Sequence, residues 1–475
     1  MDVYHDLVDD KRLITATGFC FTYENSRASS LLVEDLQISS GQLVVLCGKS
    51  GSGKSTFLRL INGLIPDYYE GKLEGQLEIA NQLAGKHSVE ECSKQVASVF
   101  QNPSSQFFHK YVKHELVLPG ENHGQSAAEI LNKLEKLTAD FALADYLERD
   151  LSTLSGGEKQ RIALLTALMQ DTDILVLDEP TANLDRSGIE QVASYLSILK
   201  QEGKTILIAE HRLDYLKDLA DRYLYFDQGV LERDYSKKEF DSLTETERHD
   251  LGLRSQQLSS SISRLEAKKQ VAPSPLMGDL TIKNLRLQAG DQELSFLEEA
   301  NFKSGAITAL VGPNGKGKST LAFYLAGLLD DEDATFSLNG HALSAHERLK
   351  DTAFVLQEVA LQLFSDSVQK ELTLGLKKAV DASNILENLG LKGLEDRHPM
   401  TLSGGEMQRL VIASQVLTKK RVFIFDEPSS GLDYQQMLQV ADLLKVLKEQ
   451  GKIILLISHD EELLEKTADY FLTLN

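Results

Sequence analysis

Residues 43–56 read Leu-Val-Val-Leu-Cys-Gly-Lys-Ser-Gly-Ser-Gly-Lys-Ser-Thr, an apolar run that leads directly into a glycine-rich loop. The apolar run predicts a strand that is buried on both faces of a parallel sheet. The loop has the spacing Gly-x4-Gly-Lys-Ser, in which backbone N–H groups can surround a phosphate and the next helix favours an anion. The stretch therefore predicts a nucleotide phosphate site at the carboxyl end of a buried strand.

The same pattern recurs in the second half of the chain. Residues 307–320 read Ile-Thr-Ala-Leu-Val-Gly-Pro-Asn-Gly-Lys-Gly-Lys-Ser-Thr, again an apolar run followed by a Gly-x4-Gly-Lys-Ser loop. In such loops the lysine reaches the β- and γ-phosphates and the serine hydroxyl binds Mg²⁺. We therefore expect Lys54 and Lys318 to bind ATP, and Ser55 and Ser319 to bind the metal.

Five further short motifs follow each phosphate loop in the same order. In chain order the two copies are Gln101 and Gln357, Leu154–Glu158 and Leu402–Glu406, Asp178-Glu179 and Asp426-Glu427, Asn183-Leu184-Asp185 and Gly431-Leu432-Asp433, and His211 and His459. From the Leu-Ser-Gly-Gly-Glu motif to the histidine, each copy is separated from its counterpart by the same 248 residues. The duplication predicts two domains that share one active-site architecture.

The duplication also predicts where the domains divide. We expect a first domain over residues 1–250, a linker over 251–278 and a second domain over 279–475. The segment before the linker has charged helical sequence, and the linker itself contains a Pro/Ser-rich stretch, which is typical of a connection between domains. We favour a simple spacer over a regulatory insert.

Composition bounds the function. The 475 residues carry a formal net charge of −21, which argues against a nucleic-acid partner because a duplex binder needs basic surface. No apolar run is long enough to cross a bilayer, and the amino terminus does not resemble a signal peptide. The three cysteines, Cys20, Cys47 and Cys92, lack metal-ligand spacing, so buried thiols are favoured over a disulfide or metal site. A cytoplasmic protein is expected.

Two adjacent acids follow a strand-like run in each half. Asp178 and Asp426 suit the Mg²⁺ shell, while Glu179 and Glu427 are placed to polarise an attacking water. The alternative is that these acids only solvate the end of a strand. The phosphate loops upstream favour the catalytic interpretation, and both halves keep the glutamate.

The Leu-Ser-Gly-Gly-Glu motif is the most discriminating one. Two glycines at a helix start expose backbone N–H groups, and the serine hydroxyl adds a further donor, so this tip can bind a γ-phosphate. The ordered set of motifs resembles the ATP-binding-cassette (ABC) ATPases, and the resemblance covers both halves. It implies an α/β fold of two tandem P-loop NTPase domains, each with a mostly parallel central sheet, an antiparallel β subdomain and a helical signature subdomain.

The resemblance also implies composite active sites. In the family, two cassettes pair head to tail, and each ATP lies between one phosphate loop and the other cassette's signature motif. His211 and His459 would hold the γ-phosphate and orient the glutamate, and Asp185 and Asp433 would communicate between the sites. A lone histidine at a strand end is more often structural, but its recurrence in both halves favours a catalytic role.

Catalysis is accordingly assigned to Glu179, Glu427, His211, His459, Gln101 and Gln357. Magnesium is assigned to Ser55, Gln101, Asp178, Ser319, Gln357 and Asp426. ATP is assigned to Tyr23, Gly48, Lys49, Ser50, Gly51, Ser52, Gly53, Lys54, Ser55, Thr56, Ser155, Gly156, Gly157, Gly312, Pro313, Asn314, Gly315, Lys316, Gly317, Lys318, Ser319, Thr320, Ser403, Gly404 and Gly405.

The two halves differ at the adenine. Tyr23 resembles the aromatic residue that stacks on adenine in ABC ATPases, whereas the equivalent position in the second half is near Ala289. Loss of a stacking contact costs about 1 kcal/mol. We expect the second half to bind ATP more loosely than the first.

The segments after the two glutamines suggest a transport role. Both have the spacing Gln-x4-Gln-apolar-Phe, at residues 101–108 and 357–364, which resembles energy-coupling-factor and cobalt importers. Phe107, Phe108 and Phe364 are then either docking residues or core residues.

This resemblance implies an ATPase that drives uptake of a vitamin, a vitamin precursor or a metal ion. The expected partners are a membrane scaffold subunit and a separate membrane capture protein, with head-to-tail pairing of the cassettes within the chain and no nucleic acid. The expected location is the cytoplasmic face of the membrane, as a peripheral protein. The alternatives are the fused ATPase of a sugar importer, and a soluble twin-cassette ATPase of translation or DNA maintenance.

Overall fold

The computed structural model describes residues 12–24, 26, 29–182, 184–257, 279–290, 292–376 and 382–474. The chain divides into two compact units, Met1–Gln256 and Gln257–Asn475. Most of the predicted linker, residues 258–278, lies outside the described residues, as does Asn183.

The first unit is built on one mixed sheet. Its strands are β1 (Arg12–Tyr23), β2 (Leu31–Ser39), β3 (Leu43–Gly48), β4 (Gly71–Ile79), β5 (Gln82–Leu83), β6 (Val96–Val99), β7 (Ile174–Asp178), β8 (Thr205–Ala209), β9 (Arg222–Asp227) and β10 (Val230–Ser236). They lie in the order β5-β4-β1-β2-β10-β9-β3-β8-β7-β6. β3, β6, β7, β8 and β9 pair in parallel, whereas β1 pairs antiparallel with β2 and β4. The parallel strands are almost wholly buried because helices cover both faces, and this explains their continuous apolar sequences.

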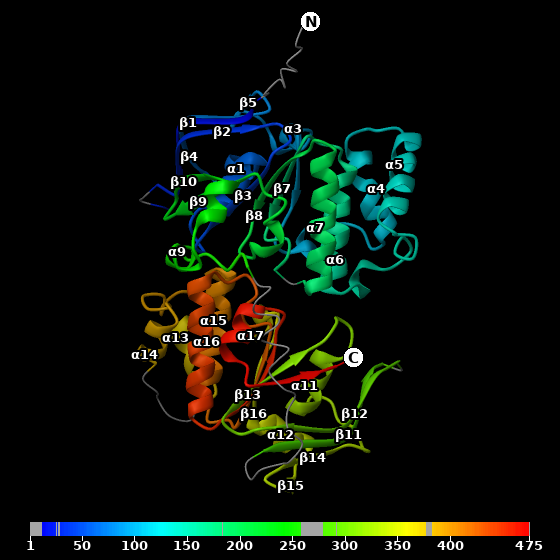
Figure 1. Ribbon diagram of the computed structural model, residues 1–475, viewed down its shortest axis with the longest axis vertical. Helices are drawn as coiled ribbons and strands as arrows, with labels where there is room; N and C mark the ends of the chain where they lie inside the picture. Colours follow the sequence, from blue (N-terminus) through cyan, green and yellow to red (C-terminus); the bar gives the residue numbers. More distant parts are fainter. Residues whose placement is uncertain are drawn as a thin grey trace, which may run out of the picture. The chain divides into compact units, whose positions relative to one another are not determined.

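Some helices of the first unit pack on this sheet, and others form a helical layer beside it. They are α1 (Lys54–Ile61), α2 (Leu64–Asp67), α3 (Val89–Cys92), α4 (Val112–Asn122), α5 (Ala127–Asp140), α6 (Gly156–Met169), α7 (Arg186–Gln201), α8 (Lys237–Ser242) and α9 (Glu245–Asp250), with 3₁₀ turns at η1 (Pro103–Gln106), η2 (Leu151–Thr153) and η3 (Asp214–Leu216). Figure 1 shows α4 and α5 on the far side of α6 from β1, β2 and β4. Val112 and Leu116 of α4 join Ile130 and Leu134 of α5 in a core that continues under the sheet.

The second unit repeats this plan with two sheets. Its strands are β11 (Leu280–Ala289), β12 (Gln292–Phe302), β13 (Ala306–Val311), β14 (Thr335–Leu338), β15 (His341–Ala342), β16 (Thr352–Val355), β17 (Val422–Asp426), β18 (Ile453–Ile457) and β19 (Tyr470–Thr473). The parallel sheet has the order β16-β17-β18-β13-β19, and the antiparallel sheet has the order β12-β11-β14-β15. The parallel order matches β6-β7-β8-β3-β9 of the first unit strand for strand.

The helices of the second unit follow the same scheme. They are α11 (Lys318–Ala326), α12 (Ala345–Asp351), α13 (Val368–Thr373), α14 (Ser383–Asn388), α15 (Gly404–Val416), α16 (Tyr434–Glu449) and α17 (Glu461–Thr467), with 3₁₀ turns at η4 (Val359–Gln362) and η5 (Pro399–Thr401). In Figure 1, α13 and α14 lie beside α15 and form the helical layer, which has its own small apolar core. The predicted fold class, including the antiparallel and helical subdomains, is confirmed.

The charged helical segment before the linker packs on the first unit. The ring of Phe240 in α8 stacks on Tyr223 of β9 with centroids 3.8 Å apart. The buried Arg248 of α9 donates to the carbonyl of Phe240 and to Gln256, and Gln256 donates to the Tyr223 hydroxyl. These contacts hold the chain to the first unit as far as Gln256.

Candidate active sites

The first phosphate loop connects β3 to α1. Gly48 has φ 140°, and a Cβ there would lie 2.1 Å from the carbonyl oxygen of Phe226, so only glycine fits. Gly53 caps α1 in the left-handed region with φ 104°. The buried Lys54 donates from Nζ to the carbonyls of Gly48 (2.9 Å) and Lys49 (3.0 Å). The loop therefore wraps around its own lysine, as a site for a multiply charged phosphate requires.

The second phosphate loop, between β13 and α11, has the same geometry. Gly317 caps α11 with φ 89°, and Lys318 donates to the carbonyls of Gly312 (2.8 Å) and Pro313 (2.9 Å). Lys318 Nζ also lies 3.3 Å from Oδ1 of Asn314. Both loops thus place an ammonium group at the start of a helix.

A serine and an aspartate meet beside each loop. Ser55 Oγ donates to Asp178 Oδ1 at 3.1 Å, and Ser319 Oγ donates to Asp426 Oδ2 at 2.9 Å. Adjacent hydroxyl and carboxylate oxygens fit Mg²⁺, which prefers hard oxygen ligands. Burial, with Glu179 adding repulsion, raises the pKa of Asp178 to about 6, and burial also raises the pKa of Asp426. A cation at either position would supply the positive charge that these buried carboxylates need.

Glu179, directly after β7, is held by two side chains from other segments. Gln101 Nε2 donates to its Oε2 at 2.8 Å, and His211 Nε2 lies 3.4 Å from its Oε1. Burial opposes ionisation, but His211, Lys54 and Gln101 outweigh it and hold the pKa of Glu179 below its usual value. The carboxylate is therefore ionised at neutral pH and able to accept a proton from water.

Glu427 has a related but different set of contacts. It lies 3.8 Å from Nε2 of His459, and its Oε2 accepts from the backbone N–H of His459 (3.3 Å) and from Ser458 Oγ (3.4 Å). Asn314 Oδ1 lies 3.2 Å from His459 Nε2, which links the phosphate loop to the histidine. The second unit therefore brings its glutamate and its histidine together as the first unit does.

Both glutamates have an uncommon backbone conformation. Glu179 has φ 47° and Glu427 has φ 49°. Each donates its N–H to the carbonyl of the last residue of the neighbouring strand, Ala209 in β8 or Ile457 in β18. A positive φ at a residue other than glycine costs on the order of 1 kcal/mol or more and concentrates at functional sites. Its recurrence at these two positions supports the catalytic interpretation.

The signature serines cap the helices that follow them. Ser155 Oγ accepts the N–H of Glu158, whose carboxylate accepts the N–H of Ser155 at 2.8 Å. Ser403 and Glu406 repeat this capping box. Each cap is followed by the two glycines that begin the helix, Gly156 and Gly157 in α6 and Gly404 and Gly405 in α15. The contact of each signature with the other unit's nucleotide stays a prediction.

Tyr23 lies at the end of β1, close to the first phosphate-loop helix. Its hydroxyl lies 3.1 Å from Thr56 Oγ1 and accepts a 3.4 Å hydrogen bond from Arg59, both in α1. This position agrees with a contact to a base whose phosphates lie at the same helix. The side chain of Ala289 lies outside the described residues, so the predicted difference between the two adenine sites remains a prediction.

The glutamine segments are organised by local hydrogen bonds. Gln106 and Gln362 accept the N–H groups of Phe100 (3.0 Å) and Leu356 (2.8 Å). Glu115 and Glu371 accept pairs of N–H groups from the turns that begin at Phe108 and Phe364. Phe107 packs on the core, whereas Phe108 is 82% exposed and Phe364 is 77% exposed. The shared Gln-x4-Gln-apolar-Phe spacing is therefore explained by the folding of the loop itself.

One residue beside the first site was not predicted. Glu210 precedes His211 and is buried against Thr181, which follows Glu179 by two residues. The second unit has Ser458 at this position, so comparison of the two copies in the sequence could have identified it.

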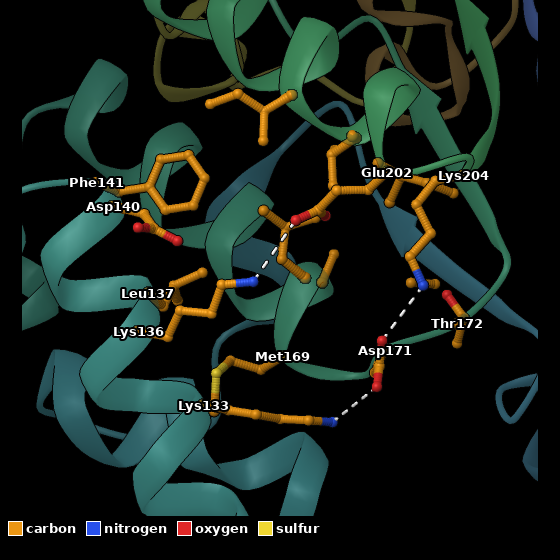
Figure 2. A pocket seen from close by; sticks show the side chains of 16 residues that line it. Lys133, Lys136, Leu137, Asp140, Phe141, Met169, Asp171, Thr172, Glu202 and Lys204 are labelled. Atoms are coloured by element: carbon orange, nitrogen blue, oxygen red, sulfur yellow. Dashed lines mark hydrogen bonds and ion pairs between the residues drawn. The ribbon is translucent and has the colours of Figure 1, made fainter. Parts of the chain in front are cut away.

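A cavity of about 220 Å³ in the first unit lies away from the nucleotide site. Figure 2 shows it between α5 and the segment before β7, where Lys133 and Lys204 each approach Asp171 and Lys136 approaches Glu202. It opens near the amino-terminal ends of β6 and β7, whereas the phosphate loop follows the carboxyl end of β3. It therefore belongs to the contact between the helical layer and the sheet.

The family model described as ABC transporter matches residues 33–182 and 298–430. Two Treponema denticola proteins, each named putative ABC transporter ATP-binding protein, are 37% identical to this chain. One alignment covers 98% of this chain and 95% of the relative, and the other covers 96% and 94%. A Methanosarcina mazei protein of the same name is 31% identical over 96% of this chain and 92% of its own length.

Solved structures also match nearly the whole chain. RNase-L Inhibitor covers 96% of this chain and 87% of its own, with a TM-score of 0.65 and 22% identity. The archaeal recycling factor aABCE1, in a complex with ribosomal stalk protein aP1, has the same coverage, a TM-score of 0.63 and 23% identity. A model of ribosome-bound archaeal Pelota and ABCE1 covers 96% of this chain and 76% of its own, with a TM-score of 0.69 and 22% identity.

The predicted partner set is contradicted by this comparison. We expected a membrane scaffold and a membrane capture protein and excluded nucleic acid, but two of the whole-chain matches are described in complexes with a ribosome or a ribosomal stalk protein. The physical reason for the error is that the glutamine segments, which led to the membrane partners, have a local structural explanation. Among the described residues, no helix combines the length and the apolar character needed to span a bilayer.

The motifs, the fold and the sequence relatives agree in both halves of the chain. ABC ATPases bind ATP with Mg²⁺. Each unit has a lysine, a serine, an aspartate and a glutamate at the positions that the sequence motifs predict for this chemistry. This chain belongs to the ABC family and is an ATPase with two fused cassettes.

Proposed function

We propose that the chain works as an ATP-driven clamp, in which each ATP is bound by the phosphate loop of one unit and the signature motif of the other. In the first site, Lys54 neutralises phosphate charge, and Ser55 and Asp178 hold Mg²⁺. Mg²⁺ would supply charge stabilisation at the phosphates. Glu179 takes the proton of the attacking water, and His211 and Gln101 orient the Glu179 carboxylate. Lys318, Ser319, Asp426, Glu427, His459 and Gln357 take the corresponding roles in the second site.

The observation that carries this proposal is the recurrence of one arrangement in both units. In each unit the glutamate comes directly after a buried strand, has a positive φ, and lies within 4 Å of the histidine. We infer that each signature motif, whose two glycines begin a helix, binds the phosphate that the other unit's loop holds. Closure then depends on the γ-phosphate, which ADP lacks.

Substitution of the signature serine tests the composite sites. Ser403→Arg in a Glu427→Gln chain should abolish the remaining hydrolysis, which belongs to the site around Lys54. Ser155→Arg in the same background should have a much smaller effect, because that serine serves the other site. Equal effects of the two substitutions would contradict the composite arrangement.

The role favoured by the whole-chain structural matches is that of a twin-cassette ATPase of translation. Its support is that the matching structures include ribosome-bound ABCE1 and aABCE1 with a ribosomal stalk protein. Sedimentation of gently lysed cells tests it, because the Glu179→Gln/Glu427→Gln chain should be trapped with ATP on ribosomes. Absence of the chain from ribosomal fractions under these conditions would contradict this role.

A second candidate is the ATPase of a transport system, of the energy-coupling-factor type. Its support is that two relatives, 37% identical over nearly the whole chain, are named putative ABC transporter ATP-binding proteins, and that Phe108 and Phe364 are exposed. Uptake of labelled vitamins, vitamin precursors and metal ions should then fall in cells that carry only the Glu179→Gln/Glu427→Gln chain. Unchanged uptake together with ribosome binding would exclude this candidate.

A further inference from the structure

Glu210, immediately before the catalytic histidine of the first unit, is 2% exposed and fully hydrogen-bonded. Its Oε1 accepts the backbone N–H groups of His211 (2.8 Å) and Arg212 (3.2 Å). Its Oε2 accepts the hydroxyls of Thr181 (2.7 Å) and Tyr215 (3.1 Å). A buried carboxylate with this many donors fixes the groups that bind it, because releasing any of them leaves a buried polar atom unsatisfied.

The carboxylate joins two loops that carry the reacting groups. Thr181 is in the turn after β7, two residues beyond Glu179, whereas His211 is in the loop after β8. The 3.4 Å approach of His211 to Glu179 spans these same two loops. Glu210 therefore links the loop after β7 to the loop after β8. The separation of these two loops sets the distance between the His211 imidazole and the Glu179 carboxylate.

The second unit makes the same connection with a different residue. The position of Glu210 is taken by Ser458, and the acid is instead Asp460, on the other side of His459. Asp460 Oδ2 accepts the hydroxyl of Ser429 at 2.7 Å, and its Oδ1 accepts the N–H of Leu463. Ser429 is the counterpart of Thr181, 248 residues further along the chain.

In both units, the hydroxyl at the position of Thr181 or Ser429 donates to a buried acid. The acid precedes the histidine in the first unit and follows it in the second. A purely local stabilising role for Glu210 would not require its counterpart to keep this one partner. The loops Glu-His-Arg, at residues 210–212, and Ser-His-Asp, at 458–460, are two solutions to a single geometric requirement.

We propose that Glu210 is a positioning residue for ATP hydrolysis in the first unit, which holds His211 against Glu179 through Thr181, and that Asp460 does the same in the second unit. This role rests on the proposed function of Glu179 and His211. The four groups that donate to Glu210 all lie outside the phosphate loop, so its loss should affect the chemical step more than nucleotide binding.

The test uses the full chain with Glu427→Gln, so that the remaining turnover belongs to the first unit. Glu210→Ala should lower kcat about tenfold or more while the KM for MgATP changes less than about twofold. The amides of His211 and Arg212, which lose their acceptor, should exchange hydrogen faster in the nucleotide-free protein. Tyr215→Phe, which removes one of the hydroxyl donors, is the matched control and should lower kcat less than threefold.

Transplanting the other loop provides a rescue. Glu210→Ser alone should behave as Glu210→Ala, whereas Glu210→Ser with Arg212→Asp recreates Ser-His-Asp and should restore kcat to within about threefold. A double variant no better than the single one overturns the proposal, as does an unchanged kcat in Glu210→Ala. If Glu210→Ala does not fold, the rescue comparison still decides.

A further comparison distinguishes failure of the positioning role of Glu210 from failure of the proposed catalytic role of Glu179. Glu179→Gln in the same Glu427→Gln chain should abolish turnover. Persistent hydrolysis in that chain would overturn the catalytic site itself. Loss of hydrolysis there, with no effect of Glu210→Ala, would overturn only the positioning role.

Discussion

Gln101 Nε2 donates a 2.8 Å hydrogen bond to Oε2 of Glu179, so the segment after β6 is tied to the carboxylate after β7. The other oxygen of that carboxylate faces His211 at 3.4 Å. The proposed base is thus oriented from two sides by segments that are distant in the sequence.

Gln101→Ala should slow hydrolysis at the first site without preventing nucleotide binding. The bond that is lost has a charged acceptor, and such bonds contribute about 1.5–3 kcal/mol, so kcat should fall roughly tenfold or more. Steady-state ATPase assays in the Glu427→Gln chain measure this effect. Gln82→Ala on the edge strand β5 is a control that should leave kcat unchanged, and equal kcat for the two variants would contradict the role of Gln101.

The two glutamates proposed as general bases, Glu179 and Glu427, should each control one site. Loss of a general base lowers the rate about 10²–10⁴-fold, so Glu179→Gln and Glu427→Gln should each remove the turnover of their own site. The doubly substituted chain should hydrolyse ATP at least about 100-fold more slowly than the parent. Because the substitution is nearly isosteric, ATP binding measured by equilibrium titration should persist. Substantial turnover in the double variant would show that the base lies elsewhere.

Tyr23→Ala should weaken nucleotide binding at the first site by about 1 kcal/mol, or roughly fivefold, through loss of the adenine contact. ATP titration of a Lys318→Ala chain, in which the second site is impaired, measures this change. The same experiment in a Lys54→Ala chain reports on the second site, which we expect to bind ATP more loosely. Equal affinities in the two lysine variants would contradict that difference.

Metal-free stability should depend on the titration of Asp178. Burial raises its folded-state pKa to about 6, so its stabilising contribution is complete below an ordinary pKa of about 4 and is lost as the pH rises through 6. Relative to Asp178→Asn, the parent should therefore lose about 2 kcal/mol between these values.

Thermal unfolding in the presence of EDTA measures this loss as a shift of several degrees in the transition of the first unit. Asp426→Asn serves as the control and should alter the transition of the second unit instead. A pH-independent difference between Asp178→Asn and the parent would contradict the raised pKa.

The sequence predicted the phosphate loops, the two acids after β7 and β17, and the parallel strands between them. These features depend on local rules: glycines at positive φ, as at Gly53, and apolar runs such as 174–177 that require burial on both faces. Both copies keep these features in the same order, which indicates one shared architecture. The sequence could not predict the role of the glutamine segments, since the same spacing is compatible with a folded turn and with a docking surface, and the structure shows the turn.

By itself, the sequence determined that this protein has two ABC cassettes, each with the ordered motifs from which the ATP-hydrolysing residues are predicted. Only the tertiary structure decided how Glu179 is held, because Gln101 is 78 residues away and the contact forms only when parallel strands align. It also decided the surroundings of Glu210, whose four hydrogen-bond donors come from the turn after β7 and from residues 211–215 after β8. Short-range patterns fix which groups are present, whereas distances between groups on separate strands depend on the packing of the whole sheet.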